Sequence, residues 1–334
     1  MLNSSSAKWL GLLAGAAMTL LAFIGSVMLG TTPLEWSALW RMLTAYDPAN
    51  VAHIILYTER LPRAVVAALV GASLAVAGAL MQTMTRNPLA SPGILGINAG
   101  AMFFVVVAVA LLPLHTPALY VGAALLGALV AASLVALLSR GRYGENSPLR
   151  VVLAGGAVTA MFASFSQGLL VVDQQSFESV LYWLAGSVAG RDLDLVLPLL
   201  PLFGGAIVLS ALLVRHANAL LLGDDMVTSL GMRAGSIKLL LGLVVIVLAG
   251  SSVALAGMIG FVGLIVPHMA RRLFGIDHRW MLPGCAVLGA CLLLLADTAS
   301  RFLIPPQEVP VGVMTALIGT PFFIYLARRN MARQ

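Results

Sequence analysis

Residues 61–100 read LPRAVVAALVGASLAVAGALMQTMTRNPLASPGILGINAG, and they combine a long apolar run with a run rich in proline and glycine. The apolar part, 61–84, carries one charged residue, Arg63. It is slightly longer than the roughly 20 residues that a helix needs to cross a bilayer. The stretch therefore predicts a membrane-spanning helix followed by a break in regular structure.

The same apolar character extends over the whole chain of 334 residues, of which 60% are hydrophobic and 10% are charged, with a mean hydropathy of +1.00. Because a soluble domain carries about 25% charged residues, this composition excludes a soluble globular enzyme. At roughly 20 residues per span, the length allows about ten helices with short loops. We expect a single all-α integral membrane domain over residues 1–334.

Charge gives the topology. With a cytoplasmic N-terminus, 14 of the 19 basic residues fall inside and 5 outside, which is the sign that the positive-inside rule requires. Both termini are then cytoplasmic. The first segment is preferred as a retained helix over a signal peptide, since it is long and no clear A-x-A site follows. The ten expected spans are 10–29, 61–84, 94–112, 118–139, 149–172, 193–214, 239–256, 258–273, 282–296 and 311–327.

The sequence lacks the features of an ATP-binding P-loop, a cysteine metal site or disulfide, and an ion-coupled carrier. Lysine occurs only at Lys8 and Lys238, and neither completes a phosphate-binding P-loop. The two cysteines, Cys285 and Cys291, fit buried packing better than a metal site or a disulfide. The expected spans are nearly free of ionisable groups, which argues against coupling to an ion gradient. These features predict a permease driven by a separate protein.

The break after the second span has two interpretations. Irregular backbone is tolerated at membrane depth only where protein or a water-filled cavity surrounds it. The segment is therefore either a broken helix near a translocation path or a plain cytoplasmic turn, and the residues favour neither. The candidate residues are Asn87, Pro88, Pro92, Gly93, Gly96 and Asn98.

Two further segments stand out. Residues 257–272 carry glycines at three-residue intervals, which allow close helix approach, and His268 is read as a packed residue in preference to a ligand. Residues 218–238 form the longest cytoplasmic connection and are either a solvated loop or a docking element. Its candidate residues are Leu222, Gly223, Asp224, Asp225, Leu230 and Gly231.

Taken together, five motifs resemble the FecCD-type permeases, the membrane subunits of ABC importers for ferric siderophores, haem and cobalamin. The motifs are Leu61-Pro62-Arg63, Gly78-Ala-Leu-Met-Gln82, Arg86-Asn87-Pro88-Leu89-Ala90-Ser91-Pro92-Gly93, Phe261-Val-Gly263-Leu-Ile-Val-Pro267-His268 and Asp277-His278-Arg279. The resemblance covers about residues 60–327. It specifies the family far better than the substrate.

The resemblance implies a type II ABC importer permease fold in the bacterial inner membrane. It implies a second permease subunit, two cytoplasmic ATPases that bind ATP and Mg²⁺, and a periplasmic or lipid-anchored binding protein, with no cofactor in this chain. Segment 218–238 would be the coupling loop, with Gly223 and Gly231 allowing tight turns. Arg60, Arg63 and Arg301 would pair with carboxylates of the binding protein, whereas interfacial anchoring is their plainer interpretation.

One departure concerns the cytoplasmic gate that the cobalamin permease carries before its fifth helix. The matching residues here are Ser147, Pro148 and Leu149, so proline and leucine replace a hydroxyl pair.

We predict a permease for a ferric siderophore-type chelate that works by alternating access and does no covalent chemistry. Haem or cobalamin remains an alternative solute, and an ion-coupled secondary carrier or a membrane anchor remains an alternative class. Homodimer and heterodimer are not distinguished.

Overall fold

A computed structural model describes residues 2, 4–112, 116–139, 148–172, 185–305 and 307–331, which are predominantly helical and form no strand beyond one isolated bridge. The long helices are α1 (Ser5–Met28), α4 (Leu61–Thr85), α5 (Ile97–Leu111), α6 (Pro117–Leu138), α7 (Pro148–Val172), α10 (Leu200–Leu212), α13 (Ala234–Ala256), α14 (Val262–Phe274), α15 (His278–Ser300) and α16 (Val311–Met331). The short elements are α2 (Trp36–Thr44), α3 (Val51–Ile54), η1 (Ile55–Arg60), η2 (Pro92–Leu95), α9 (Leu193–Val196), η3 (Leu197–Leu199), α11 (Val214–Leu220) and α12 (Asp224–Ser229).

Each of the ten expected spans overlaps one long helix, although the sixth also includes α9 and η3, so the all-α membrane fold is confirmed. Seven helical segments of the described chain are long and apolar enough to cross a membrane, and two more are apolar but shorter. The count of about ten is therefore approximate. The eighth span begins at Val262 instead of residue 258, because residues between Gly257 and Phe261 leave the helical conformation, with φ of +70° and +66° at those two positions.

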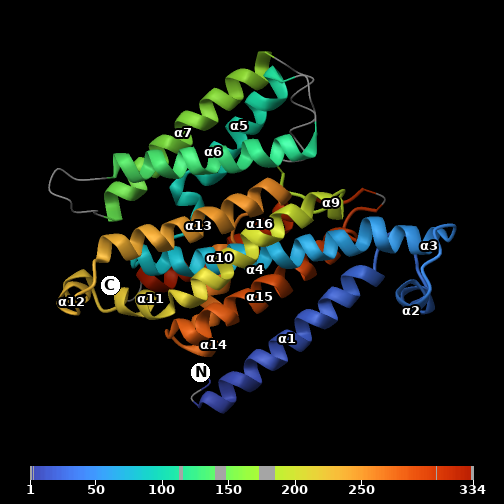
Figure 1. Ribbon diagram of the computed structural model, residues 1–334, viewed down its shortest axis with the longest axis horizontal. Coiled ribbons are helices and arrows are strands. Elements are labelled where there is room, and N and C mark those ends of the chain that lie inside the picture. Colours follow the sequence, from blue (N-terminus) through green and yellow to red (C-terminus); the bar gives the residue numbers. More distant parts are fainter. Residues whose placement is uncertain are drawn as a thin grey trace.

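The helices form two groups (Figure 1). α5, α6 and α7 pack on one another, and they join the remaining helices mainly through α13. In the larger group α4 packs against α13, α14 and α15, while α1 lies along α15 at the edge. The start of α1 and the short helices α11 and α12 lie at one end of the molecule, opposite α2 and α3.

Glycine pairs determine how closely α4 approaches its neighbours. A Cβ atom added at Gly71 would lie 2.3 Å from the carbonyl oxygen of Gly289 in α15, and one added at Gly78 would lie 1.9 Å from that of Gly263 in α14. Both contacts are too short for any side chain, so backbone packs on backbone at these crossings. Small residues serve this purpose in membrane helices, where close van der Waals packing replaces the hydrophobic driving force.

Candidate functional site

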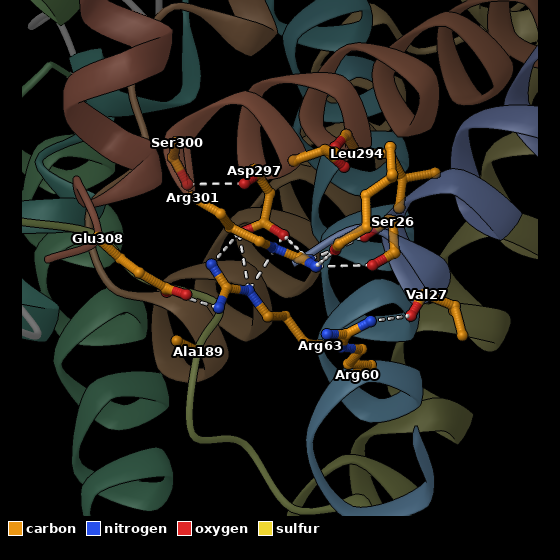
Figure 2. A network of polar contacts seen from close by, with 12 residues as sticks. Ser26, Val27, Arg60, Arg63, Ala189, Leu294, Asp297, Ser300, Arg301 and Glu308 are labelled. Atoms are coloured by element: carbon orange, nitrogen blue, oxygen red, sulfur yellow. Dashed lines mark hydrogen bonds and ion pairs between the residues drawn. The ribbon is translucent and has the colours of Figure 1, made fainter. Parts of the chain in front are cut away.

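The last turn of α15 carries a buried polar cluster around Asp297, whose side chain is 1% exposed (Figure 2). Arg63 donates to this carboxylate from Nη2 at 2.9 Å and from Nε at 3.0 Å. Arg301, 2% exposed, donates to the other oxygen at 2.5 Å. The remaining Nη1 of Arg63 pairs with Glu308 at 2.6 Å. One buried carboxylate thus bridges two guanidinium groups from α4 and α15.

Arg60 and Arg301 also complete the end of α1. Arg301 donates to the carbonyls of Ser26 and Leu29 at 2.6 and 2.8 Å, and Arg60 donates to those of Val27 and Met28 at 3.2 and 2.6 Å. The last carbonyls of a helix lack intrahelical donors, and positive charge there opposes the negative end of the helix dipole. These two side chains therefore hold α1 against α4 and α15.

This geometry bears on the docking prediction for Arg60, Arg63 and Arg301. The three residues do lie together at one end of the molecule, but two of them are buried and bonded within the chain. Only the Arg63–Glu308 pair reaches the surface, since Glu308 is 33% exposed. Sequence reasoning missed Glu308, because its position between Gln307 and Val309 in a largely apolar, proline-rich loop gave no signal for this contact.

The proline- and glycine-rich segment after α4 packs within the protein. Arg86 adopts left-handed φ of 50°, Asn87 accepts a hydrogen bond from the Leu89 N–H at 2.9 Å, and η2 follows. Gly96, at φ +68°, then opens α5. A Cβ atom at Gly155 of α7 would lie 1.8 Å from the carbonyl oxygen of Ile94.

The surroundings of this segment favour one of the two interpretations. Pro92 and Gly96 are buried, Pro92 faces Gly263 of α14, and Pro88 is exposed. α5 has 15 residues and is about 22 Å long, shorter than the roughly 30 Å hydrocarbon core. The irregular backbone between Pro92 and Gly96 thus packs against α7 and α14, as a broken helix requires, whereas the preceding turn at Arg86 and Pro88 is exposed. Gly93 and Asn98 are half-buried beside it.

The predicted coupling loop, 218–238, runs from the end of α11 through α12 to the first turn of α13 and contains two tight turns. Gly223 and Gly231 adopt φ of +113° and +75°, which side chains rarely allow. Leu222, Met226 and Leu230 are exposed before, within and directly after α12. Val227 alone of this short helix is fully buried and anchors it. Three unpartnered apolar side chains on a polar loop are typical of a docking surface.

Ion pairs and hydrogen bonds connect this loop to three long helices, α4, α13 and α15, and α4 is in turn bonded to α14. Asp224 pairs with Arg86 at the end of α4 at 2.5 Å and with Lys238 of α13 at 2.6 Å. Asp225 is exposed in the first turn of α12. At the base of α14, Arg271 donates to Gln82 of α4 at 3.0 Å. The loop and the helix ends at this side thus form one bonded unit.

Asn218 at the end of α11 completes the connection to α15. Its amide donates to Asp277 at 2.7 Å, and its oxygen accepts from the His278 N–H at 3.0 Å, while Thr83 of α4 bonds the His278 ring at 2.7 Å. Burial raises the pKa of Asp277, but hydrogen bonds from the Arg279 N–H and the Asn218 amide outweigh burial and hold the pKa below its usual range. No feature of the sequence singled out Asn218.

Two other predictions concern the cytoplasmic gate at 147–149 and the packing of His268. Ser147 of the expected gate lies outside the described residues, and Pro148 and Leu149 form the first turn of α7. The gate therefore stays a prediction. The His268 ring packs edge-on against Phe322 of α16 with centroids 5.7 Å apart, as expected of a packed residue.

A model of the FecCD transport family matches residues 18–329. The chain belongs to the FecCD transport family. It is 48% identical over 329 residues to the Bacillus subtilis (strain 168) protein named "Probable siderophore transport system permease protein YfiZ", covering 98% of each chain. It is 41% identical over 319 residues to the "Iron(3+)-hydroxamate import system permease protein FhuB" of the same organism, covering 96% of this chain and 83% of that one.

Solved structures support the same assignment. An inward-facing structure of a metal-chelate type ABC transporter superposes with a TM-score of 0.82 at 28% identity, over 95% of this chain and 98% of that chain. This FecCD member is therefore a multi-pass permease with the fold of an ABC transporter membrane subunit. The resemblance inferred from the five motifs is confirmed over nearly the whole chain.

Proposed function

We propose that this FecCD permease moves a ferric siderophore-type chelate across the bacterial inner membrane by alternating access, powered by two separate cytoplasmic ATPase subunits. A second permease subunit completes the pathway, and a periplasmic or lipid-anchored binding protein delivers the chelate. The substrate class is supported by the two relatives above, which are named for siderophore and iron-hydroxamate transport. ATP and Mg²⁺ belong to the partner subunits.

The observation that carries the proposal is the coupling loop. It offers Leu222, Met226 and Leu230 to a partner while Asp224 and Asn218 bond it to α4, α13 and α15. A rigid-body shift of a docked ATPase would therefore act on three transmembrane helices at once. A secondary carrier would have no use for an external docking surface bonded in this way.

The orientation follows from the same loop. The end that carries α11 and α12 also carries Arg215, Arg233 and Arg272, and this basic character supports a cytoplasmic location under the positive-inside rule. The N-terminal start of α1 lies at that end, and both termini are then cytoplasmic. The Asp297 cluster faces the outside, where the binding protein docks.

For docking, Arg63 is the member of the arginine set that meets the partner. Glu308 occupies its Nη1 and is partly exposed, so a carboxylate of the binding protein can exchange with Glu308. Arg60 and Arg301 act behind it by fixing the end of α1. Charge complementarity of this kind gives specificity and association rate more than affinity.

Uptake into proteoliposomes tests the proposal. The permease is reconstituted with its ATPase, and ⁵⁵Fe-hydroxamate chelate, hemin and cobalamin are supplied separately with the binding protein. ATP-dependent accumulation of the ferric chelate is expected, and it should fall at least tenfold with Met226→Asp while Met226→Leu retains it. Uptake that persists without the ATPase, or preferred uptake of hemin or cobalamin, would contradict the proposal.

A further inference from the structure

A cavity of about 690 Å³ lies between α4, α6 and α13 at the end that carries α12. α6 and α13 belong to different helix groups and lie side by side there (Figure 1). The inner wall is apolar and includes Met84, Val135, Leu239 and Ile246. This volume falls within the range of about 300–1,000 Å³ that is usual for ligand sites. None of the transport contacts described above uses this wall.

The mouth of the cavity is basic. Arg86, Arg233 and Lys238 line it together with one acid, Asp224, so three positive charges face one negative charge and leave a net charge of +2. Asp224 already bridges Arg86 and Lys238. Arg233 is exposed and has no ion pair within the part of the chain that the structure describes. The mouth thus retains an uncompensated guanidinium.

The first turn of α13 adds to this field. α13 follows Arg233, whose side chain forms no cap hydrogen bond, and its first turn carries no acidic residue. Gly235 and Ser236 of that turn line the cavity. The N–H groups of a helix start favour anions, so they reinforce the basic side chains around the same opening.

We propose that this cavity binds an anionic phospholipid of the cytoplasmic leaflet. An acyl chain lies along the apolar wall toward Ile246, and the phosphate lies between Arg233 and Lys238 at the start of α13. An apolar cavity with a cationic mouth matches an amphiphile with a negative headgroup in both parts. Basic pockets between transmembrane helices on the cytoplasmic side suit such headgroups. A zwitterionic lipid would satisfy the wall but leave the charge at the mouth uncompensated.

Native mass spectrometry of the purified full-length permease tests this site with phosphatidylglycerol, phosphatidylcholine and inorganic phosphate as probes. Wild-type protein is expected to retain one phosphatidylglycerol in preference to phosphatidylcholine. Arg233→Gln should weaken that binding about fivefold, which is typical for one basic group at a membrane surface. Arg272→Gln is the matched control, because it removes an exposed arginine near the same end but outside the cavity.

A second variant tests the acyl chain separately. A Cβ atom at Gly242 points toward Met84 at an ordinary contact distance of 3.5 Å, so Gly242→Leu fills the wall without altering any charge. It should also lower lipid retention, whereas Gly205→Leu on α10, where nothing lies within 4 Å, should not. All variants must elute as monodisperse protein.

Three results would overturn the proposal. Equal retention of phosphatidylcholine would make the site a general hydrophobic slot. If inorganic phosphate displaced phosphatidylglycerol and Gly242→Leu did not lower lipid retention, the cavity would be a simple anion site. Equal loss in Arg233→Gln and Arg272→Gln would mean that the lipid binds the basic surface as a whole. These outcomes can be told apart from a failure of the proposed transport function, because Arg233 and Gly242, the residues varied in the cavity, make none of the ion pairs or hydrogen bonds that connect the coupling loop to the helices.

Discussion

Replacing Asp297 by asparagine should destabilise the permease more than removing any other single charge of the polar cluster around it. The carboxylate is 1% exposed and accepts from both Arg63 and Arg301. Asparagine keeps the shape but leaves two guanidinium groups without their shared countercharge, and Arg301 is itself 2% exposed. Removing one partner of a buried ion pair costs about 3–5 kcal/mol. We expect a loss of this size in the free energy of unfolding.

Asp224 provides the matched comparison, because it also bridges two basic residues, Arg86 and Lys238, but is 46% exposed. Exposed pairs contribute about 0–1 kcal/mol each, so Asp224→Asn should cost less than about 2 kcal/mol. Glu308→Gln should cost less than about 1 kcal/mol, since it leaves the buried carboxylate in place.

The assay is reversible unfolding in mixed micelles of mild detergent and SDS, followed by tryptophan fluorescence. The three variants and wild type are compared at one pH and one salt concentration. If Asp297→Asn lost no more stability than Asp224→Asn, burial would not be what makes this carboxylate important, and the reasoning would be wrong. A higher salt concentration should reduce the loss of unfolding free energy caused by Asp224→Asn. The loss caused by Asp297→Asn should stay almost unchanged, because salt screens buried ion pairs less than exposed ones.

Three further predictions concern the other end and the core. Gly78→Ala places a methyl group 1.9 Å from the carbonyl oxygen of Gly263 and should cost at least about 1–3 kcal/mol, whereas Gly156→Ala, with nothing within 4 Å, should be neutral in the same unfolding assay. Asn218→Ala leaves buried polar groups without partners and should cost about 1–3 kcal/mol; it should also reduce ATP-driven uptake, and unchanged uptake would remove the coupling role. Asp277 has a lowered pKa in the folded chain, so its contribution is present above its unfolded pKa of about 3.9 and is lost as pH falls through the lower folded value. The stability difference between wild type and Asp277→Asn should therefore be constant above about pH 5 and shrink below about pH 4, and a difference that grew on acidification would have the wrong sign.

The positions of the helices were predictable because each depends on a local property. Apolar runs of membrane length, prolines and glycines at their ends, and the side on which arginines gather are all read along the chain. The eighth span began later than expected, because hydropathy counts Met258 and Ile259 as helical while the backbone turns at Gly257 and Phe261. The turns at Gly223 and Gly231 were likewise predictable, since glycine lacks a Cβ atom and adopts the positive φ of such turns without steric cost.

By itself the sequence determined that this chain is an all-helical membrane permease of one family, whereas the docking role of residues 218–238 stays a prediction. It could not determine which charges remain free. Arg63 meets Asp297 across 234 residues of sequence, and Asn218 meets Asp277 across 59. Such pairs form only where packed helices bring side chains that are distant in the sequence together. The close contact between Gly78 and Gly263 likewise depends on how α4 and α14 cross. Only the tertiary structure could therefore show that Arg60 and Arg301 complete α1, while Arg63 and Glu308 reach the surface.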